Sequence, residues 1–399
     1  MRVIVFGTGT VARGVLGFLF SKAGYEVIFV DGNEDALRYL NEEREYPVRI
    51  EGAYPIDTLV RDVQAIAVSD IDKVAEAIEQ CDIIATAVGS GVIRHIVPVL
   101  KEGLRRRMQR GIAVDVLLCE DFVDAPGFLQ QLIAAEMDDL ELQRFKRTVG
   151  LVEGYIVGMT QTFDWAGPHP LAVRVWESDH VILNQNAFVG PVLNIPGVTA
   201  YEEFEFYRTR HLVLQTLCRT MVSCLGLYMG YHSLCQAAAD PIICLCVQNA
   251  LLESAVAMSR KYDFEIGALL EYSYSLLWGL KYLQDTPTMP GENANREATI
   301  RELALHELSP YRSLLTASKL CEAKEVPPAF VTLGIACALN TPKRSKEYDV
   351  QKVMAQEWFT QGCKEIKLCE ALLEALEAGE PLQRVYELAE KWRNSKLAG

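Results

Sequence analysis

The chain has 399 residues, of which 50% are hydrophobic and 23% charged, and its formal net charge at pH 7 is −14. This length exceeds that of one typical hydrophobic core, so we expect two domains. The acidic balance argues against a nucleic-acid partner and against attraction to anionic membranes. The most apolar stretch, residues 212–230, contains Gln215 and Arg219 and is broken by glycines. We therefore predict a buried helix there rather than a membrane span.

The chain contains 11 cysteines, an odd number, and many of them lie in apolar runs with helical spacing. This pattern favours buried, reduced thiols over a disulfide framework. No pair of Cys or His residues has zinc-finger spacing, so we predict no metal site. The N-terminus begins with a strand instead of a charged region and an apolar core, so we predict no signal peptide and a cytoplasmic location.

A short apolar strand at residues 3–6 leads into the sequence GTGTVARG at residues 7–14. In a dinucleotide-binding turn the first glycine allows the tight turn and the second lets the backbone approach a pyrophosphate. A small third residue keeps helix and strand close. Gly7, Gly9 and Ala12 occupy these three places. The helix that follows presents free N–H groups and the positive end of its dipole to the phosphates.

A second strand, residues 26–30, is followed by Asp31, 24 residues after Gly7. A carboxylate at the tip of this strand accepts hydrogen bonds from the adenosine ribose and repels a 2′-phosphate, so we predict NAD rather than NADP as the cofactor. The alternative is an ordinary strand–helix turn with no ligand. Three glycines within eight residues argue against it, because glycines at a helix start are destabilising unless a close approach requires them.

Strand and helix patterns alternate through the rest of the first half. We predict helices at 34–43, 71–80 and 98–110, and strands at 48–50, 65–68, 82–89 and 114–119. This alternation indicates a Rossmann-type, doubly wound parallel sheet. Ligands of such sheets bind beyond the C-terminal ends of the strands. Val88 and Gly89 end one of these segments and Glu120 follows another, so we predict that all three contact the cofactor.

The alternation of strand and helix patterns ends near residue 150. Residues 151–162 and 171–176 read as extended segments, whereas helical periodicity dominates from about residue 201. We expect long helices at 202–229, 241–262 and 266–283, and a helical pair within 350–396. The predicted organisation is an NAD-binding α/β domain with extra strands at 1–200 and an all-α substrate domain at 201–399. We expect the substrate to bind where the two domains meet.

The order of these features resembles that of the mannitol-1-phosphate 5-dehydrogenase and long-chain polyol dehydrogenase family. The matching pieces are residues 6–14, Ala85–Gly89, Cys119-Glu120, Val149–Val152, Asn194–Gly197, Leu225-Gly226, Glu253-Ser254 and Arg260–Tyr262. The resemblance implies an NAD-binding Rossmann domain joined to a helical substrate domain. It also implies metal-independent hydride transfer between the nicotinamide and a secondary alcohol or ketone of a sugar alcohol.

The chain departs from the family where the substrate reacts. The family has a Lys on one helix, an Asn five residues later and a His three residues beyond; this chain has His211, Thr216 and Arg219 there. Asp121 replaces the family's Asn after Cys-Glu, and we predict it as an acid–base residue or part of the substrate floor. A helix N-terminal acid is the alternative. The family's arginine-rich phosphate-binding stretch retains only Arg296, Arg301 and Arg312, without the family spacing.

His211 is the candidate for the missing base, because an imidazole accepts a proton near neutral pH. His211, Gln215 and Arg219 are spaced four residues apart and share one helical face. Such a face offers a base, an amide and an anion-binding guanidinium, so we predict His211 and Arg219 as catalytic residues. The alternative is that His211 caps the helix or pairs with surface acids such as Glu203 or Glu205.

Three further groups have structural alternatives. Arg13 either touches the pyrophosphate or is exposed to solvent. The run Arg105–Arg107 is predicted to be the solvated face of a helix. Aromatic residues with helical spacing predict core packing rather than a sugar-stacking platform; they are Tyr272, Tyr274, Trp278 and Tyr282.

Together the residues and the resemblance predict an NAD-dependent oxidoreductase acting on a CH–OH group of a polyol, sugar acid or sugar phosphate. The partner is a small molecule, and the chain is a monomer or a homodimer. Two alternatives remain, because family likeness does not transfer a reaction when the reacting residues differ. One is a non-catalytic member that binds NAD(H), and the other is a non-redox enzyme, such as an epimerase or lyase, with tightly bound NAD.

Overall fold

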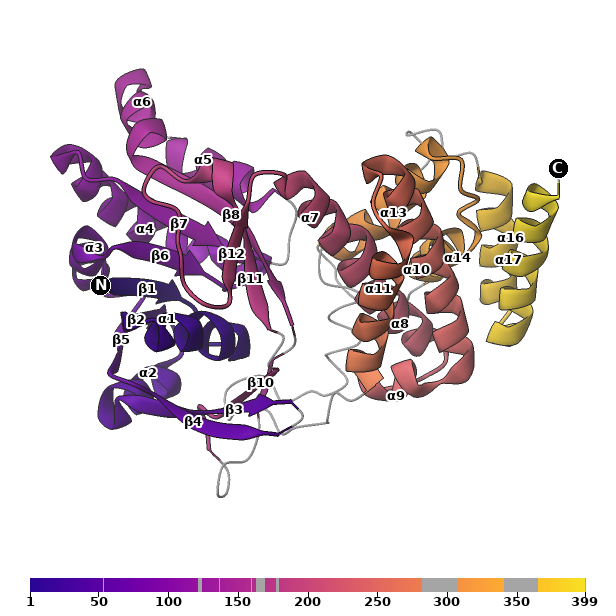
Figure 1. The fold of residues 1–399 in the computed structure, drawn as a ribbon, viewed down its shortest axis with the longest axis horizontal. Helices are drawn as coiled ribbons and strands as arrows, with labels where there is room; N and C mark the ends of the chain where they lie inside the picture. The colour runs from indigo at the N-terminus through magenta and orange to yellow at the C-terminus, as the bar shows by residue number, and fades with distance from the viewer. Residues whose placement is uncertain are drawn as a thin grey trace. The chain divides into compact units, whose positions relative to one another are not determined.

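The computed structural model describes residues 1–52, 54–120, 124–135, 137–158, 160–162, 169–176, 179–281, 308–340 and 365–398. The chain divides into two compact units, with a boundary between Phe204 and Glu205. The first unit combines sheets and helices, and the described part of the second is helical (Figure 1). The predicted fold class is therefore confirmed.

The main sheet of the first unit has eight strands among the described residues, in the order β12-β11-β8-β7-β6-β1-β2-β5. Its strands are β1 (Arg2–Phe6), β2 (Glu26–Asp31), β5 (Val63–Ala67), β6 (Ile83–Thr86), β7 (Val114–Leu118), β8 (Val149–Val157), β11 (His180–Asn184) and β12 (Val198–Tyr201). All neighbours pair in parallel except β8 and β11. The order from β5 to β8 is that of the Rossmann fold, whose ligand crevice lies where the strand order reverses, here between β1 and β6.

Helices cover both faces of this sheet. On one face are η1 (Ala12–Gly17), α1 (Phe18–Lys22) and α2 (Glu34–Glu43); on the other are α3 (Ile71–Gln80), α4 (Ser90–Arg110), α5 (Ala125–Ala134) and α6 (Asp139–Thr148). Side chains of β1 alternate between the two cores, with Val3 and Val5 on the η1 side and Ile4 and Phe6 on the α3 side. Because all four are fully buried, the strand that leads to the glycine turn lies at the centre of the unit.

The starts of the helices follow their capping residues. Asn33 and Asp70 each accept a hydrogen bond from the N–H group three residues on, which begins α2 and α3 where the sequence predicted. The predicted start of the next helix at Pro98 was wrong, because α4 begins at Ser90, directly after Gly89. Proline is favoured in a first helical turn, but here it lies in the helix interior.

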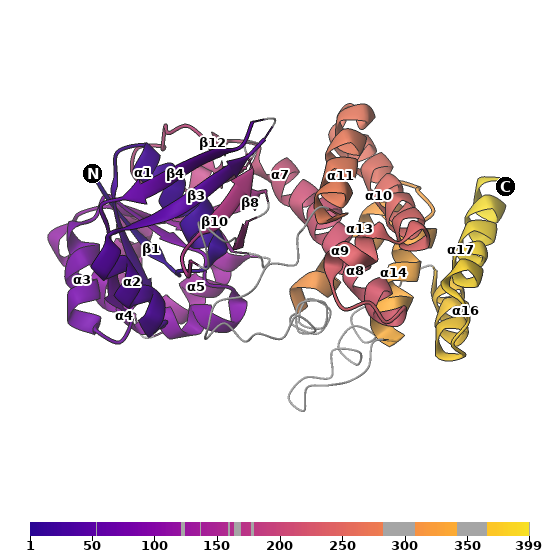
Figure 2. The ribbon, with the colours of Figure 1, turned by 90° about the horizontal axis from the view of Figure 1, so that it is seen from below.

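A second sheet packs over η1. Its strands are β4 (Ile56–Arg61), β3 (Glu45–Glu51), β10 (Val173–Trp176) and β9 (Gln161–Thr162), in that order. Figure 2 shows β3 and β4 beside α1, which continues η1. A Cβ atom added at Gly14 would lie 2.9 Å from the side chains of Val173 and Val175. Only glycine therefore lets β10 approach the helix this closely.

The second unit contains, among its described residues, α7 (Phe204–Arg210, which begins at the boundary), η3 (His211–Thr216), α8 (Leu217–Tyr228), α9 (Leu234–Ala239), α10 (Pro241–Tyr262), α11 (Ile266–Lys281), α13 (Leu308–Ala323), α14 (Ala329–Asn340), α16 (Ile366–Glu377) and α17 (Leu382–Leu397). Helices α16 and α17 lie side by side (Figures 1 and 2). The predicted segments 282–283 and 350–364 lie outside the described residues.

Helix α10 is long and apolar enough to cross a membrane by length and composition alone. However, 61% of its apolar window is buried inside the protein, where the helix packs against α11, α13 and α14. It is therefore a core helix of the second unit. The stretch predicted as a buried helix at 212–230 forms parts of η3 and α8, most of whose residues are buried.

The ten cysteines in the described parts of the chain are all thiols, and nine of them are buried. This confirms the expectation for these residues. Burial raises the pKa of the Cys218 and Cys246 thiols to about 12. Such thiols stay protonated and unreactive at neutral pH.

Candidate functional site

The glycine turn after β1 meets the turn after β6 at the reversal point of the sheet. Gly7 has a φ of +104°, and a Cβ atom there would lie 2.6 Å from the carbonyl oxygen of Ala87. The N–H group of Ala87 donates to the carbonyl of Phe6 at 3.0 Å, so the two turns are joined through their main chains. Only glycine fits this conformation and this contact.

Gly9 has the opposite surroundings. A Cβ atom there would meet nothing within 4 Å, so the backbone of this turn faces open space. Ala12, the third small residue, is fully buried in η1. The open approach at Gly9 and the close packing at Ala12 fit the requirements of a dinucleotide pyrophosphate. The contacts of Gly7, Gly9 and Ala12 with a cofactor stay predictions.

Asp31 lies at the end of β2, next to the glycine turn. Its Oδ2 atom accepts from the N–H group of Thr8 at 2.5 Å and from the Thr8 hydroxyl at 2.7 Å. Its Oδ1 atom accepts from the N–H groups of Gly32 and Asn33 at 2.6 and 3.0 Å. The side chain is partly exposed. An acceptor for a ribose hydroxyl is therefore present at the strand tip, and its orientation is fixed by the protein.

Hydrogen bonds join Glu120 to the turn that contains Val88 and Gly89. The buried Glu120 carboxylate accepts from the N–H group of Val88 at 3.2 Å and from that of Gly89 at 2.8 Å. Gly89 is the N-cap of α4, so the carboxylate lies at the positive end of this helix. Glu120 thus holds the turn after β6 in place. Asp121 lies outside the described residues.

Arg13 is buried, with 1% of its surface exposed, so of its two alternatives solvent exposure was wrong and contact with the pyrophosphate stays a prediction. Its Nε atom donates to the carbonyl of Leu171 at 3.1 Å, and its Nη1 atom donates to the carbonyl of Thr8. Main-chain carbonyls compensate the cost of burying the guanidinium. The side chain ties the glycine turn to the segment before β10, a contact that sequence reasoning could not find because Leu171 is 158 residues away.

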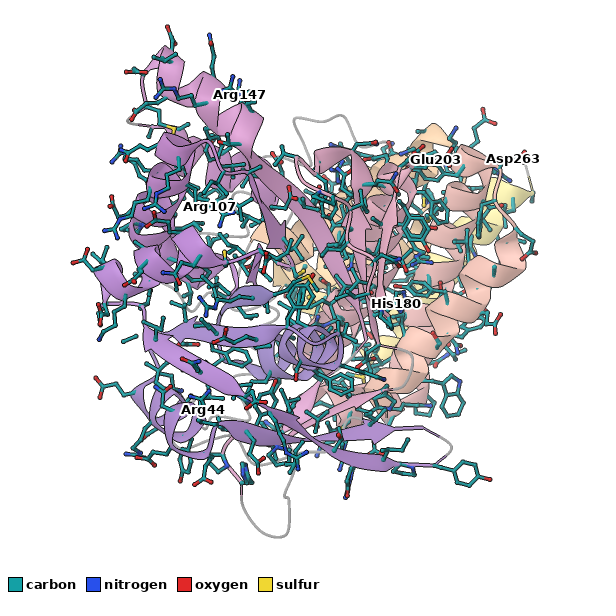
Figure 3. The ribbon with its side chains drawn as sticks, turned by 60° about the vertical axis from the view of Figure 1, so that its left-hand side comes forward. Arg44, Arg107, Arg147, His180, Glu203 and Asp263 are labelled. Atoms are coloured by element: carbon teal, nitrogen blue, oxygen red, sulfur yellow. The ribbon has the colours of Figure 1, made fainter. Side chains whose placement is uncertain are left out.

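Arg107 also contradicts its prediction, because only 4% of it is exposed (labelled in Figure 3). Its guanidinium donates to the carbonyls of Ile78, Cys81 and Ala113 at 2.9, 2.6 and 2.7 Å. It therefore anchors α4 to the neighbouring turns. In the predicted solvated run, Arg106 does form surface ion pairs.

In the second unit, the predicted reaction residues lie along one continuous helical run. His211 begins the π-helical segment η3, Gln215 lies within it, and Arg219 follows in α8. His211 and Gln215 are each 7% exposed. His211 is therefore not a surface residue, and Glu205, one of the acids named as its alternative partner, pairs with Arg208 at 2.7 Å. A π-helical turn widens a helix locally and is frequent at functional sites.

Gln215 is held by a residue from another helix. The hydroxyl of Tyr272, in α11, donates to Gln215 Oε1 at 2.8 Å. Burial raises the pKa of Tyr272 to about 12, so the phenol remains a hydrogen-bond donor at neutral pH. The Arg210 guanidinium lies 4.3 Å from the centre of the Tyr272 ring, a cation–π contact. No signal in the sequence distinguished Tyr272 as a positioning residue.

The other aromatic residues of this run do not all pack in the core. Tyr274 is 38% exposed and Trp278 is 54% exposed, so the prediction of core packing was wrong for these two. Both lie on the outer side of α11, because the apolar period of this helix is carried by Leu269, Leu277 and Leu280. Tyr282 lies outside the described residues.

Glu253, part of a family-like motif, lies buried in α10. Its Oε2 atom accepts from the N–H groups of Phe330 and Val331, each at 3.0 Å, at the start of α14. Burial raises the pKa of Glu253 to about 8, although these hydrogen bonds lower it. The residue therefore joins α10 to α14, in the same way that Glu120 joins β7 to α4.

Within the described ranges, no group of three His, Cys, Asp or Glu side chains is placed to hold a metal ion. Arg296 and Arg301, the remnants of the phosphate-binding stretch, lie outside those ranges, as does the side chain of Arg312.

Residues 1–197 match the family model described as the mannitol dehydrogenase Rossmann domain. The mannitol-1-phosphate 5-dehydrogenase of Halalkalibacterium halodurans is 29% identical over 320 residues, which cover 79% of this chain and 83% of that protein. The enzyme of the same name from Geobacillus thermodenitrificans is 30% identical over 269 residues, 66% of this chain and 69% of the relative.

Two solved structures share the fold at low identity. A D-sorbitol dehydrogenase in substrate-free form has a TM-score of 0.68 at 13% identity, covering 95% of this chain and 94% of that one. The Pseudomonas fluorescens mannitol 2-dehydrogenase, in a ternary complex with NAD and D-mannitol, has a TM-score of 0.63 at 12% identity. The match covers 100% of this chain and 94% of the mannitol 2-dehydrogenase chain. Likeness in sequence and in fold thus extends over both units.

Proposed function

Because the chain belongs to the mannitol dehydrogenase family, we propose that it transfers hydride between NAD and a secondary alcohol or ketone of a polyol, sugar acid or sugar phosphate. The relatives that it matches along most of its length are named as dehydrogenases, and the chain is an oxidoreductase of this family. The named substrate of these relatives, mannitol 1-phosphate, is the first substrate to test.

The observation that carries the cofactor assignment is the pair of contrasting glycines at the reversal point of the sheet. Gly7 is locked against Ala87, whereas Gly9 presents bare backbone to open space. In this proposal the turn with Gly7, Gly9 and Ala12 holds the pyrophosphate, and the adjoining turn with Val88, Gly89 and Glu120 also contacts the cofactor. Asp31 accepts a hydrogen bond from the adenosine ribose, which favours NAD over NADP. A bound NAD would supply the hydride acceptor for oxidation of the alcohol, and a bound NADH the hydride donor for the reverse reduction.

Oxidation of an alcohol also needs a base for the hydroxyl proton and donors for the developing alkoxide. We assign the proton to His211, which stands at the position of the family's Lys. Arg219 supplies the positive charge that binds an anionic group of the substrate, and Asp121 is the third candidate. The fixed amide of Gln215, four residues from His211, supports this assignment.

We assign cofactor binding and substrate binding to different domains. Residues 1–200 form the NAD-binding domain, and residues 201–399 form the helical substrate domain. The partner is a small molecule, and the protein acts as a monomer or homodimer. The buried thiols fit a reducing compartment, so we place the protein in the cytoplasm.

The proposal is tested by following NADH absorbance with polyols, ketoses, sugar acids and their phosphates, in both directions. We expect a substrate-dependent change, largest with mannitol 1-phosphate or its ketose phosphate. NADH binding without turnover on any of these substrates would contradict the dehydrogenase and favour a non-catalytic member, as the substitution of the family's Lys by His211 suggests. NAD that co-purifies with the protein and does not exchange would favour a non-redox enzyme.

A further inference from the structure

The carboxylate of Asp31 is held by the residue in the middle of the glycine turn. Both the hydroxyl and the N–H group of Thr8 donate to Oδ2, at 2.7 and 2.5 Å. The N–H groups of Gly32 and Asn33 hold Oδ1. Of these four donors, only the Thr8 hydroxyl belongs to a side chain. It is therefore the one donor that a substitution removes while the main chain keeps its course.

Thr8 is itself fixed in place. It is 4% exposed, and its carbonyl accepts from the buried guanidinium of Arg13, which also donates to the carbonyl of Leu171. The hydroxyl of Tyr46, from β3, donates to the carbonyl of Arg13 at 2.8 Å. The main chain of Thr8 is thus held on one side by Asp31 and on the other by the second sheet. The position of the Thr8 hydroxyl is therefore fixed, and the Asp31 carboxylate cannot rotate without breaking its hydrogen bonds to Thr8.

We propose that Thr8 is a positioning residue that sets the preference for NAD over NADP by holding the Asp31 carboxylate at the tip of β2. The inference rests on the proposed function only in that residues 1–200 bind a nicotinamide dinucleotide. The ribose hydroxyls of NAD donate to a carboxylate at this place, whereas the 2′-phosphate of NADP is repelled by it. A carboxylate that rotates freely moves aside for the phosphate; a carboxylate with four donors does not.

The arrangement leaves room for the ribose. Asp31 is partly exposed, so a ribose hydroxyl can reach its carboxylate from the solvent side. The four protein donors already occupy the two usual acceptor directions of each oxygen. The ribose hydroxyl therefore binds as an additional donor that shares one of these oxygens. Holding the acceptor in advance also spares the entropy of ordering it when NAD binds.

The test is a direct titration of NADH and of NADPH, followed by nicotinamide fluorescence, into the unaltered protein and into Thr8→Val and Thr8→Ser. Valine has the shape of threonine without the hydroxyl, and serine keeps the hydroxyl. We expect Thr8→Val to lower the ratio of the NADPH Kd to the NADH Kd about tenfold. The reason is that one hydrogen bond to a charged group is lost. Thr8→Ser keeps the ratio within about twofold, since the bond to Asp31 remains.

An unchanged ratio in Thr8→Val would overturn the inference, and so would an equal loss of both affinities, because that result indicates damage to the pyrophosphate turn instead. Thermal unfolding of each apo variant verifies that it is folded. If Thr8→Val does not fold, Thr8→Ala and the retained ratio of Thr8→Ser decide the question. Failure of the unaltered protein to bind either dinucleotide would overturn the proposed function, and the inference with it.

Discussion

The turns around Gly7 and the helical run around His211 differ in what they are made of. The first is built mainly from main-chain groups at the ends of neighbouring parallel strands. In it, Gly7 lies against Ala87, and the Glu120 carboxylate accepts from the N–H groups of Val88 and Gly89. The second is built from side chains of separate helices, as in the bond between Tyr272 and Gln215. Both regions contain a π-helical segment, η1 or η3. A site made by main-chain geometry leaves a glycine signature in the sequence, whereas a site made by side chains from distant helices leaves none.

The largest effect is expected for Gly7→Ala. The substitution places a Cβ atom 2.6 Å from a main-chain oxygen at a φ of +104°, so we expect a loss of about 3 kcal/mol or more in the free energy of unfolding. NADH binding is lost with it. Gly24→Ala is the matched control, because Gly24 has a φ of +83° and nothing within 4 Å of a Cβ atom. Urea denaturation should show a loss of only about 1–2 kcal/mol for this control; equal losses would contradict the contact between the two turns.

His211→Ala removes the proposed base in the second unit. We expect kcat to fall by about 10²- to 10⁴-fold, as for loss of a general base, while the NADH Kd changes little. His211→Lys restores the residue that the family has at this place, so activity should return in part and its pH optimum should rise. Steady-state kinetics over a range of pH measures both. Turnover that is unchanged in His211→Ala would remove this residue from the mechanism.

Glu253 gives the helical unit a pH-dependent stability. Its pKa is raised to about 8 in the folded protein from an ordinary value near 4.5, so the folded state binds the proton more tightly than the unfolded state. The contribution of Glu253 to stability should therefore be greatest at low pH and fall as the pH rises from 4.5 to 8, by up to about 1.4 kcal/mol per pH unit. The difference between the protein and Glu253→Gln, measured by denaturation from pH 5 to 8.5, should show this slope. A difference that does not vary with pH would refute the raised pKa.

Tyr272→Phe is the smallest change. The ring that stacks on Arg210 is kept, and only the hydroxyl that holds Gln215 is lost, so we expect about 1 kcal/mol or less in stability. If Gln215 orients the substrate, the KM for the substrate rises several-fold while the NADH Kd stays the same. Gln215→Glu keeps the acceptor oxygens as a control. An unchanged KM in Tyr272→Phe would leave Tyr272 with a role in packing only.

Local signals predicted much of the fold. Helices α2, α3 and α10 begin at the predicted residues because Asn33, Asp70 and Asp240 cap their first N–H groups. The glycine turn, the strand that ends at Asp31 and the parallel sheet follow from motif spacing and alternation. These features depend on residues within one or two turns of each other.

Long-range contacts could not be predicted. A guanidinium reads as solvated in a sequence, yet Arg13 and Arg107 are buried against main-chain carbonyls supplied by other segments. Pro98 predicted a helix start, but α4 begins eight residues earlier, after the turn at Gly89, and no local signal at Pro98 indicated this. The Thr8 hydroxyl and Tyr272 act through partners 23 and 57 residues away. In each case the spatial neighbour, absent from the local sequence, decides the role.

We propose that the glycine turn of the first unit binds NAD(H). The most direct measurement is the NADH affinity of Gly9→Ala compared with that of the unaltered protein, with both shown to be folded. A Cβ atom at Gly9 meets nothing in the protein, so stability should change by about 1 kcal/mol or less. We expect the affinity for NADH to fall at least tenfold nevertheless, about 1.4 kcal/mol, because the methyl group occupies the approach of the pyrophosphate. Equal NADH affinity in the two proteins would show that the glycine turn does not bind the pyrophosphate.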